Sequence, residues 1–463
     1  MIKRETYKFE GGFYRTALAL ALPIAFQNLL TSCATLIDTA MVAGLGDASI
    51  SAMGLAGRFA FLLNLVCFGF SSGCASLLSQ YWGAKETDNV RRSYGLVLLL
   101  SMSFGLVYTL ALATMPTLLM HIFSDKAEII ALGAGYLRIY ALAVPFIVFA
   151  QITCMALRSI EMVHIPLISA AASVGINVFM NWCLIEGHLG FPRMELRGAA
   201  LASAIGCIVQ ALIVLFFVLF SKKNPFHTRP RNLFKLNREF CRKYIRVAAP
   251  VLFNETMWAI GTNIYVMVFG RHDGHPGYTL YENIQQIFFV FFVGICGACS
   301  IMVGTRIGRG DHEGGYQVAK RFSIMTPIVG VILGAMLILV REPILALFPN
   351  ATEYAREVAS ACLLFYGCWL AIRMIPYTQV CGIFRAGGDT KIGCIFELVA
   401  LYGMGIPAVL IAGLLFRPEN FVVLLAVMFI AEDGLKSIMC IRHFRSRKWI
   451  KQITDQKIDE IEA

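Results

Sequence analysis

Charged residues are scarce in this chain. Only 15% of its 463 residues are Asp, Glu, Lys or Arg, whereas soluble domains carry about 25%. Hydrophobic residues make up 58% of the sequence, and the mean hydropathy is +0.68. This composition excludes an ordinary soluble enzyme or binding domain, and it indicates a polytopic membrane protein.

The signatures of nucleotide hydrolysis and of common hydrolytic catalysis are also absent. The sequence contains no Walker A loop, no H-E-x-x-H and no G-x-S-x-G. No histidine lies deep in an apolar segment, because His164, His227 and His312 fall in connections, so a histidine proton relay is not expected. The sequence therefore predicts that the chain is not an enzyme, has no cofactor, and depends on an ion gradient for energy.

The cysteines and the net charge of +11 each have a simple explanation. Most of the fourteen cysteines lie inside apolar segments, where they act as small reduced core residues, and Cys296-x-x-Cys299 has no second pair or nearby histidine to complete a zinc site. The basic residues fall between apolar segments and not on one amphipathic face, so no nucleic-acid partner is predicted. They are orientation signals.

Apolar runs between charge clusters predict an all-α membrane protein with twelve transmembrane helices. The expected spans are 16–43, 53–81, 94–115, 133–157, 166–186, 198–220, 247–270, 279–304, 322–341, 358–381, 392–416 and 421–441. The connection 221–246 holds nine Lys or Arg against one acid. It divides the chain into an N-terminal lobe (1–220) and a C-terminal lobe (247–441), and residues 442–463 form a tail.

Lys and Arg set the expected orientation. They concentrate in the even-numbered connections, in the central linker and at both termini, which therefore face the cytoplasm by the positive-inside rule. We expect a multi-pass protein of the plasma membrane, surrounded by lipid and monomeric.

The two lobes are related by an internal repeat. Pro23 recurs as Pro250 and Arg158 recurs as Arg385, both at an offset of 227 residues, with a similar segment between these anchors in each half. Each lobe has an even number of helices, so both repeats have the same orientation in the membrane. The prediction is two pseudo-symmetric six-helix bundles around a central cleft, which alternates between inward-open and outward-open states.

The first predicted span carries an unusual polar stripe. At 100° per residue, Gln27, Thr31 and Asp38 lie within about 40° of one another, with Thr35 at their edge. An acid near the centre of a span costs roughly 2.5–3.5 kcal/mol, which the surrounding apolar residues offset. In low dielectric the carboxylate takes up a proton, binds a cation or finds a donor. We favour a coupling site at Asp38 over a purely structural carboxylate, and Gln27 and Thr31 are candidates for the substrate site or a second cation site.

The fifth predicted span carries a second polar ladder. Ser169, Ser173, Asn177 and Asn181 follow one another at intervals of four residues, on one slowly rotating face. The amide oxygens of the two asparagines suit a hard monovalent cation if Asp38 supplies the charge. The alternative is ordinary hydrogen bonding between helices, at ~0.6 kcal/mol for each bond.

The seventh span contains an acid, Glu255, five residues after Pro250. With Trp258 and Tyr265 as aromatic neighbours it forms a candidate site for a cationic amphiphile or a second cation. The alternative is an acid at a helix end near the membrane surface. The offset of 227 aligns Glu255 with Asn28 and Asp38 with Tyr265, so the lobes place their acids at different depths.

Other intramembrane polar residues are weaker candidates. Tyr377 in the tenth span is a further candidate for the substrate site. Glu432, Asp433 and Lys436 in the last span are expected to neutralise one another at spacings of three and four residues.

Several segments resemble the MATE family of multidrug and toxic compound extrusion transporters, in particular its NorM-like bacterial branch. The segments are LIDTAMVAGLGDASISAMGL, FSSGCASLLSQYWGAKE, ASVGINVFMNWCLI followed by RGAALASAI, APVLFNETM, and IFRAGGDT. The resemblance covers essentially the whole chain. It implies two six-helix lobes and export of cationic amphipathic compounds in exchange for Na⁺ or H⁺.

The resemblance also assigns roles to individual residues. It implies that Asp38 is the family's first-helix acid, that Asn177 and Asn181 are its fifth-helix polar pair, and that Ser203 stands where relatives often have Thr. Asp38, Asn177 and Asn181 are then a candidate Na⁺ site. Glu255 matches the seventh-helix acid, but the tenth helix reads RMIPYTQVCGIFR, without the acid that NorM-like relatives carry there. This difference shifts the expected coupling site to the N-terminal lobe.

We considered two rival functions. A flippase for lipid-linked precursors, from a related branch of the superfamily, would need a cationic cavity for pyrophosphate, whereas the predicted spans here carry acids. A membrane receptor or an integral membrane enzyme would need a sizeable extramembrane domain or a catalytic set, and the sequence has neither.

Overall fold

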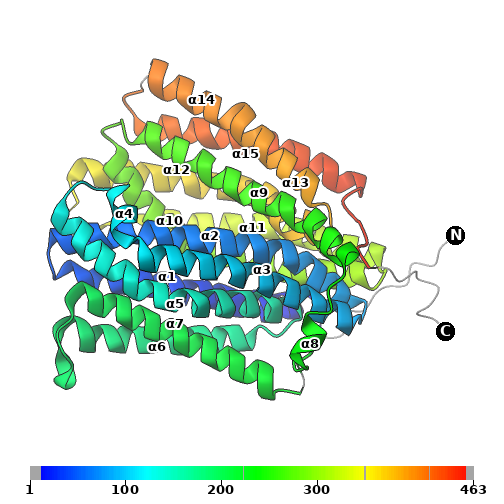
Figure 1. The fold of residues 1–463 in the computed structure, drawn as a ribbon. Coiled ribbons are helices and arrows are strands. Elements are labelled where there is room, and N and C mark those ends of the chain that lie inside the picture. The colour runs from blue at the N-terminus through cyan, green and yellow to red at the C-terminus, as the bar shows by residue number, and fades with distance from the viewer. Residues whose placement is uncertain (1–11, 223, 349–350, 417, 455–463) are drawn as a thin grey trace. The chain divides into compact units, whose positions relative to one another are not determined.

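The computed structural model describes residues 12–222, 224–348, 351–416 and 418–454, and within these ranges the chain is helical with no β-strand (Figure 1). The N-terminal half contains α1 (Phe13–Ala43), α2 (Asp47–Gly83), α3 (Thr87–Thr114), α4 (Pro116–His121), α5 (Ala127–Ser159), α6 (His164–Glu186), η1 (His188–Gly190) and α7 (Glu195–Phe220). The C-terminal half contains α8 (Pro230–Leu233), α9 (Arg238–Phe269), α10 (His275–Gly308), α11 (His312–Leu345), α12 (Glu353–Tyr377), η2 (Thr378–Phe384), α13 (Thr390–Leu398), η3 (Val399–Gly405), α14 (Ile406–Leu410), η4 (Ile411–Phe416) and α15 (Phe421–Ser446).

Every predicted span corresponds to a long helix or to a continuous run of helical segments. Ten of these are long and apolar enough to cross a membrane. The other two are α9 and α15, which carry the acid Glu255 and the triplet Glu432, Asp433 and Lys436 respectively. The prediction of an all-α membrane protein with twelve transmembrane helices is confirmed.

Capping residues in the sequence mark where several of the helices begin or end. Gly187 ends α6 in the left-handed conformation, at φ 83°. Asp311, Thr352 and Asn420 each accept a backbone N–H bond at the start of α11, α12 and α15 respectively.

Two of the predicted spans contain π-helical turns, which are wider than the turns of an α-helix. The tenth predicted span begins as α12 and ends in the π-helical segment η2, and the eleventh alternates between α13, η3, α14 and η4. Such π turns are rare in proteins and are frequent at functional sites.

The chain forms two compact units. The N-terminal unit contains residues 26–78 and 86–244, and the C-terminal unit contains residues 1–25, 79–85 and 245–463. The boundary in the first helix therefore falls two residues after Pro23, the proline that leaves the carbonyl of Ala19 without its helical partner.

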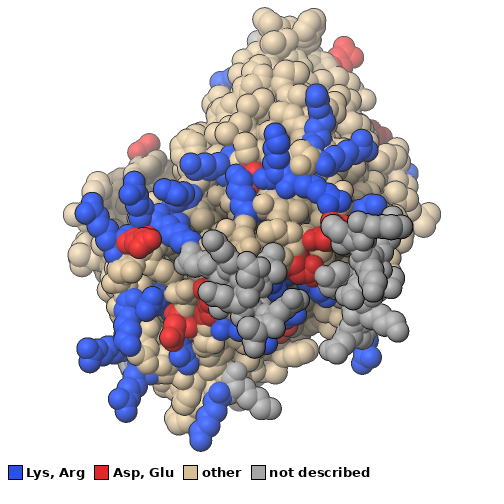
Figure 2. All heavy atoms as spheres, turned by 90° about the vertical axis from the view of Figure 1, so that its right-hand side faces the viewer, with Lys and Arg blue, Asp and Glu red and all other residues tan. Residues whose placement is uncertain are grey.

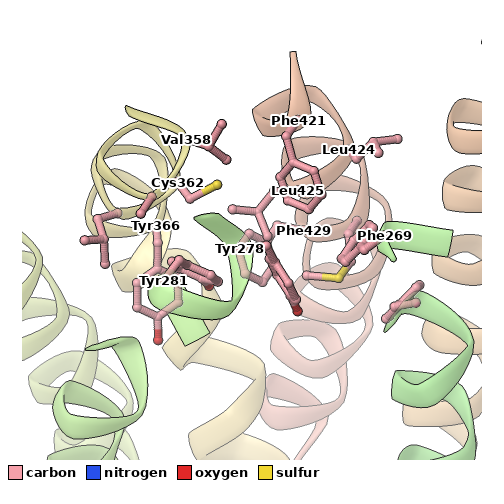
Figure 3. Packing of buried hydrophobic residues seen from close by; sticks show 14 of the residues in the cluster. Phe269, Tyr278, Tyr281, Val358, Cys362, Tyr366, Phe421, Leu424, Leu425 and Phe429 are labelled. Carbon is pink, nitrogen blue, oxygen red and sulfur yellow. The ribbon is translucent and has the colours of Figure 1, made fainter. Parts of the chain in front are cut away.

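The core of the C-terminal unit is rich in aromatic side chains (Figure 3). Phe269 of α9 meets Phe421 of α15 edge-on, with ring centroids 5.3 Å apart, and Tyr281 of α10 meets Tyr366 of α12 in the same way at 5.5 Å. Edge-to-face pairs of this kind stabilise a core by about 0.5–1.5 kcal/mol beyond their buried area. They hold α9, α10, α12 and α15 together.

In the N-terminal unit, small residues let α6 and α7 approach each other closely. Gly198, Ala202 and Gly206 recur every four residues on α7. A Cβ atom at Gly198 would lie 2.6 Å from the carbonyl oxygen of Leu184, and one at Gly206 would lie 2.9 Å from that of Ser173. This spacing of small residues is typical of tightly packed transmembrane helices. It brings the polar ladder of α6 against α7.

Candidate functional site

Four polar side chains of the N-terminal unit form a closed ring of hydrogen bonds, which we call the Asp38 ring. Asn181 Nδ2 donates to Asp38 Oδ1 at 2.5 Å and faces Asn177 Oδ1 at 3.4 Å. Asn177 Nδ2 donates to Ser203 Oγ at 3.2 Å, and Ser203 Oγ donates to Asp38 Oδ2 at 3.4 Å. Both carboxylate oxygens of Asp38 are therefore held by neutral partners.

Three helices supply the ring. Asp38 comes from α1, the two asparagines from α6 and Ser203 from α7. The asparagines point the same way because they are four residues apart on one helix. Ser203 reaches Asn177 because Gly206, one turn further along α7, allows that helix to lie directly against α6.

The charge of Asp38 is not neutralised by a base. Among the described residues, no Lys, Arg or His lies within ion-pair distance of its carboxylate. Asn177 and Asn181 are buried, whereas Asp38 is partly exposed. Because a carboxylate at this depth is costly unless it is compensated, the ring has the charge and the access of a site for a proton or a small cation.

The ring also contains a buried oxygen that has no hydrogen-bond partner. Asn181 Oδ1 is buried and accepts no hydrogen bond from the described part of the chain. Buried polar atoms are almost always satisfied, so an orphaned oxygen beside a carboxylate calls for an explanation. If the Asn181 amide turned this oxygen towards Asp38, it would join Asp38 and Asn177 as the hard oxygen ligands that a monovalent cation requires.

Gln27 and Thr31 do not join the ring. The Thr31 hydroxyl is exposed and donates to the backbone carbonyl of Gln27 at 3.0 Å, and Thr35 donates in the same way to Thr31. The two threonines thus bond within their own helix, and within the described ranges no hydrogen bond joins them or the Gln27 side chain to Asp38.

Tyr136 of α5 is a neighbour of Asp38 that the sequence reasoning missed. It lies near enough to Asp38 for the two side chains to interact electrostatically, and its ring stacks on that of Tyr140 at 6.3 Å. Two tyrosines four residues apart were the available signal, but such pairs are common in helix cores.

Glu255 has a partner that the sequence analysis did not predict. Its Oε1 accepts a hydrogen bond from Arg385 Nη2 at 2.6 Å, and both side chains are almost fully buried. Arg385 is the residue that the repeat pairs with Arg158. The sequence predicted an acid flanked by aromatic rings. In the structure this acid forms an ion pair with Arg385.

The aromatic candidates of the second site do not come together. Trp258 is 38% exposed, whereas Tyr265 is buried and donates to Glu432 Oε2 at 3.0 Å. Tyr377 packs on Phe289 with ring centroids 4.8 Å apart, and it lies close enough to interact electrostatically with Glu255. Of the three rings, the structure links only Tyr377 to that acid.

The expectation for the last helix is met only in part. Glu432, Asp433 and Lys436 lie close enough to interact electrostatically, as expected, but their bonded partners lie on other helices. Lys436 Nζ donates to Glu397 Oε1 of α13 at 2.5 Å, and Asp433 Oδ2 pairs with Arg373 of α12 at 3.2 Å.

Comparison with known proteins gives one family. The MatE family model matches residues 23–183 and again residues 250–411. The two matches begin 227 residues apart, the offset that relates Pro23 to Pro250, and so the predicted internal repeat is confirmed.

Curated relatives match along most of the chain. The "Probable multidrug resistance protein NorM" of Thermotoga maritima is 24% identical over 450 residues, which cover 96% of this chain and 95% of the relative. The "Probable multidrug resistance protein YoeA" of Bacillus subtilis is 23% identical over 406 residues, covering 86% and 87%.

Solved structures share the fold. One, described as an "Outward-facing conformation of a multidrug resistance MATE family transporter of the MOP superfamily", superimposes with a TM-score of 0.84 at 17% identity, and covers 94% of this chain and 97% of its own.

Proposed function

The chain belongs to the MatE family, and from this premise we propose that it is a secondary active transporter which exports small cationic amphipathic compounds in exchange for Na⁺ or H⁺. The family consists of membrane transporters and not of enzymes. The relatives are named as multidrug resistance proteins, which supports small-molecule substrates. The positive charge of these substrates and the identity of the coupling ion are our proposal.

A single observation carries the coupling site: the Asp38 carboxylate accepts hydrogen bonds from one amide and one hydroxyl, and no base of the described residues pairs with it. Such a group changes its charge whenever an ion arrives or leaves. An acid with a permanent basic partner would instead keep its charge fixed.

The proposed mechanism is alternating access. Binding of Na⁺ or H⁺ at the Asp38 ring favours one packing of the helices, and that packing binds the exported compound less tightly. Coupling of this kind requires only that each ligand prefers a different state. One charge crossing 100 mV supplies ~2.3 kcal/mol, which is more than a tenfold change in affinity.

Na⁺ and H⁺ make different demands on the ring. Na⁺ would be held by oxygens of Asp38, Asn177 and Asn181, and would require the Asn181 amide to turn its oxygen towards Asp38. The assignment of amide oxygen and nitrogen depends on the surrounding hydrogen bonds. A proton would sit on Asp38 itself and leave the amides in place.

The test is transport by purified protein in liposomes. Efflux of a fluorescent cationic dye is measured with a Na⁺ gradient, with a pH gradient and with neither. Asp38→Asn should abolish gradient-driven efflux and leave folding intact, whereas Thr39→Ala, on the same helix and outside the ring, should leave efflux unchanged. Movement of an anionic lipid-linked compound without dye efflux would point to a flippase instead.

Glu255 remains a proposed part of the substrate site, but in a modified role. Its charge is neutralised by Arg385, so it attracts a cationic compound only when that ion pair opens. Tyr377 lies beside the pair, and Trp258 is further along α9. Glu255→Gln should weaken dye binding without removing the response to the ion gradient.

We also propose that the protein is a monomer with both termini in the cytoplasm. The face drawn in Figure 2 carries many Lys and Arg side chains and fewer acids. By the positive-inside rule this is the cytoplasmic face. A reporter fused to either terminus should be active only inside the cell, and an active periplasmic reporter would reverse the assignment.

A further inference from the structure

The C-terminal unit contains a buried group of charges, which we call the charge cluster. Its members come from three helical segments. They are Arg373 on α12, Glu397 on α13, and Glu432, Asp433 and Lys436 on α15. Glu397, Glu432, Asp433 and Lys436 are each less than 9% exposed.

The cluster has one more acid than it has bases. Glu397 is paired with Lys436, and Asp433 is paired with Arg373. Glu432 is the third acid, and among the described residues no base lies within ion-pair distance of it. Lys436 is one helical turn away on α15, but its ammonium is bonded to Glu397. One negative charge is therefore left over.

The bonded partner of Glu432 is neutral. The Tyr265 hydroxyl of α9 donates to Glu432 Oε2 at 3.0 Å. One hydroxyl does not compensate a buried carboxylate, because an uncompensated charge in low dielectric costs far more than a single hydrogen bond returns. The cluster is electrically balanced when Glu432 carries a proton, since two complete ion pairs then remain.

The internal repeat aligns this bond with the Asp38 ring in sequence. Tyr265 aligns with Asp38, and each occupies the first helix of its lobe. Asp38 meets Ser203 on the sixth helix of its lobe, and Tyr265 meets Glu432 on α15, the sixth helix of the other. In each lobe a hydrogen bond between the first and sixth helices thus involves an acid, which lies on the first helix in one lobe and on the sixth in the other.

The fifth helix of each lobe also takes part. In the N-terminal unit this helix is α6, which supplies Asn177 and Asn181. In the C-terminal unit its counterpart contains η3, whose last residue, Gly405, lies against the bond. A Cβ atom at Gly405 would fall 2.1 Å from the Tyr265 hydroxyl and 3.3 Å from the Cβ of Glu432. Glycine and the wide π turn thus leave room for the bond.

We propose that Glu432 is a second proton-binding site, in the C-terminal unit, which takes up a proton from water and releases it during the transport cycle. The inference deepens the proposed antiport and rests on it. Protonation changes the charge of Glu432 from −1 to 0 and so removes the one unbalanced charge of the cluster. Release of the proton restores that charge. The groups that face the site are Tyr265 from α9, Arg373 from α12, Glu397 from α13, and Asp433 and Lys436 from α15.

A proton suits this site better than Na⁺ does. The oxygens of Glu397 and Asp433 are engaged by Lys436 and Arg373, and only Tyr265 adds an oxygen to those of Glu432. A hard cation requires several oxygen ligands, which the Asp38 ring offers and this site does not.

The first test detects the proton directly in the purified full-length protein in detergent. Infrared difference spectra should show the C=O band of a protonated carboxyl that is missing in Glu432→Gln. The band should move on transfer to D₂O, because the proton exchanges. In Tyr265→Phe it should remain but shift, because the carboxyl loses its hydroxyl partner. An unchanged band in Glu432→Gln would overturn the proposal.

The second test compares acids on the same helix. Glu432→Gln replaces a protonated, neutral carboxyl by a neutral amide. The midpoint temperature of unfolding should therefore stay within a few degrees of that of the unmodified protein. Asp433→Asn leaves Arg373 without its partner and should lower the midpoint by on the order of 10 °C. Equal loss in both variants would show that Glu432 is ionised, and would contradict the proposal.

Failure of this inference can be told apart from failure of the proposed function. The infrared and stability measurements need no transport. If no ion gradient drives dye efflux by the unmodified protein, the antiport proposal fails and the proton on Glu432 can still be detected. If efflux is coupled but Glu432→Gln still takes in the same number of protons for each dye exported, the second site is ruled out and the antiport stands.

Discussion

The two units place acids at membrane depth in opposite ways. In the N-terminal unit, Asp38 accepts hydrogen bonds from Asn181 and Ser203, and it has no basic partner in the part of the chain that the structure describes. In the C-terminal unit, most buried acids are paired with Arg or Lys on another helix. A paired acid has a fixed charge and stabilises one packing, whereas an acid held by amides changes its charge when an ion binds. The two halves of the repeat thus differ: one has an acid without a basic partner among the described residues, and the other is dominated by ion pairs.

The largest effect on stability should come from breaking an ion pair in the C-terminal unit. Glu397→Gln leaves Lys436 buried without its partner, and should lower the free energy of unfolding by about 3–5 kcal/mol. The double variant Glu397→Leu with Lys436→Met should recover most of this loss. Chemical denaturation in detergent measures both, and a loss below about 1 kcal/mol in the single variant would contradict a strongly desolvated pair.

The next largest effect should come from the contact that holds the Asp38 ring together. Gly198→Val places side-chain atoms against the Leu184 carbonyl and forces α6 and α7 apart, at a cost of about 1–3 kcal/mol. Gly175→Ala on α6 is a matched control, because nothing lies within 4 Å of a Cβ atom there. Equal losses in the two variants would mean that the close approach of the two helices is unimportant.

Removal of an amide from the ring should have a smaller effect on stability than on ion binding. Asn181→Ala deletes one hydrogen bond to Asp38, which is worth about 0.6 kcal/mol and at most about 1.7 in a membrane. Affinity for the coupling ion should nevertheless fall, because the orienting partner of the carboxylate is lost. Isothermal titration with Na⁺, and proton release followed with a pH dye, measure the affinity.

Ser203→Ala should have the smallest effect of the series. Its bond to Asp38 is long, at 3.4 Å, and the carboxylate keeps its shorter bond to Asn181. We expect a loss of stability of under about 0.6 kcal/mol and a modest change in ion affinity. A loss as large as that of Asn181→Ala would mean that the two donors are equivalent.

The sequence predicted the helices well and the contacts between them only in part. Apolar runs mark a span such as 166–186, which the structure places at His164–Glu186, because a membrane helix must be long and continuously apolar. The i, i+4 spacing placed Asn177 and Asn181 on one face. Their contact with Asp38 was a hypothesis from chemistry, and Ser203 entered only through family resemblance.

What the sequence could not provide was the choice of partner between distant segments. The local spacing rule assigned Lys436 to Glu432, but Lys436 bonds to Glu397, 39 residues away along the chain. Glu255 likewise bonds to Arg385, 130 residues away. The π segments η2, η3 and η4 have no signature in the sequence, because they depend on how neighbouring helices pack.

The most direct test of the central claim is dye efflux by Asp38→Asn in liposomes that carry an imposed Na⁺ or pH gradient. The account predicts that the variant folds and still binds dye, but that neither gradient drives efflux. Gradient-driven efflux at the rate of the unmodified protein would show that the exchanged ion does not bind at Asp38.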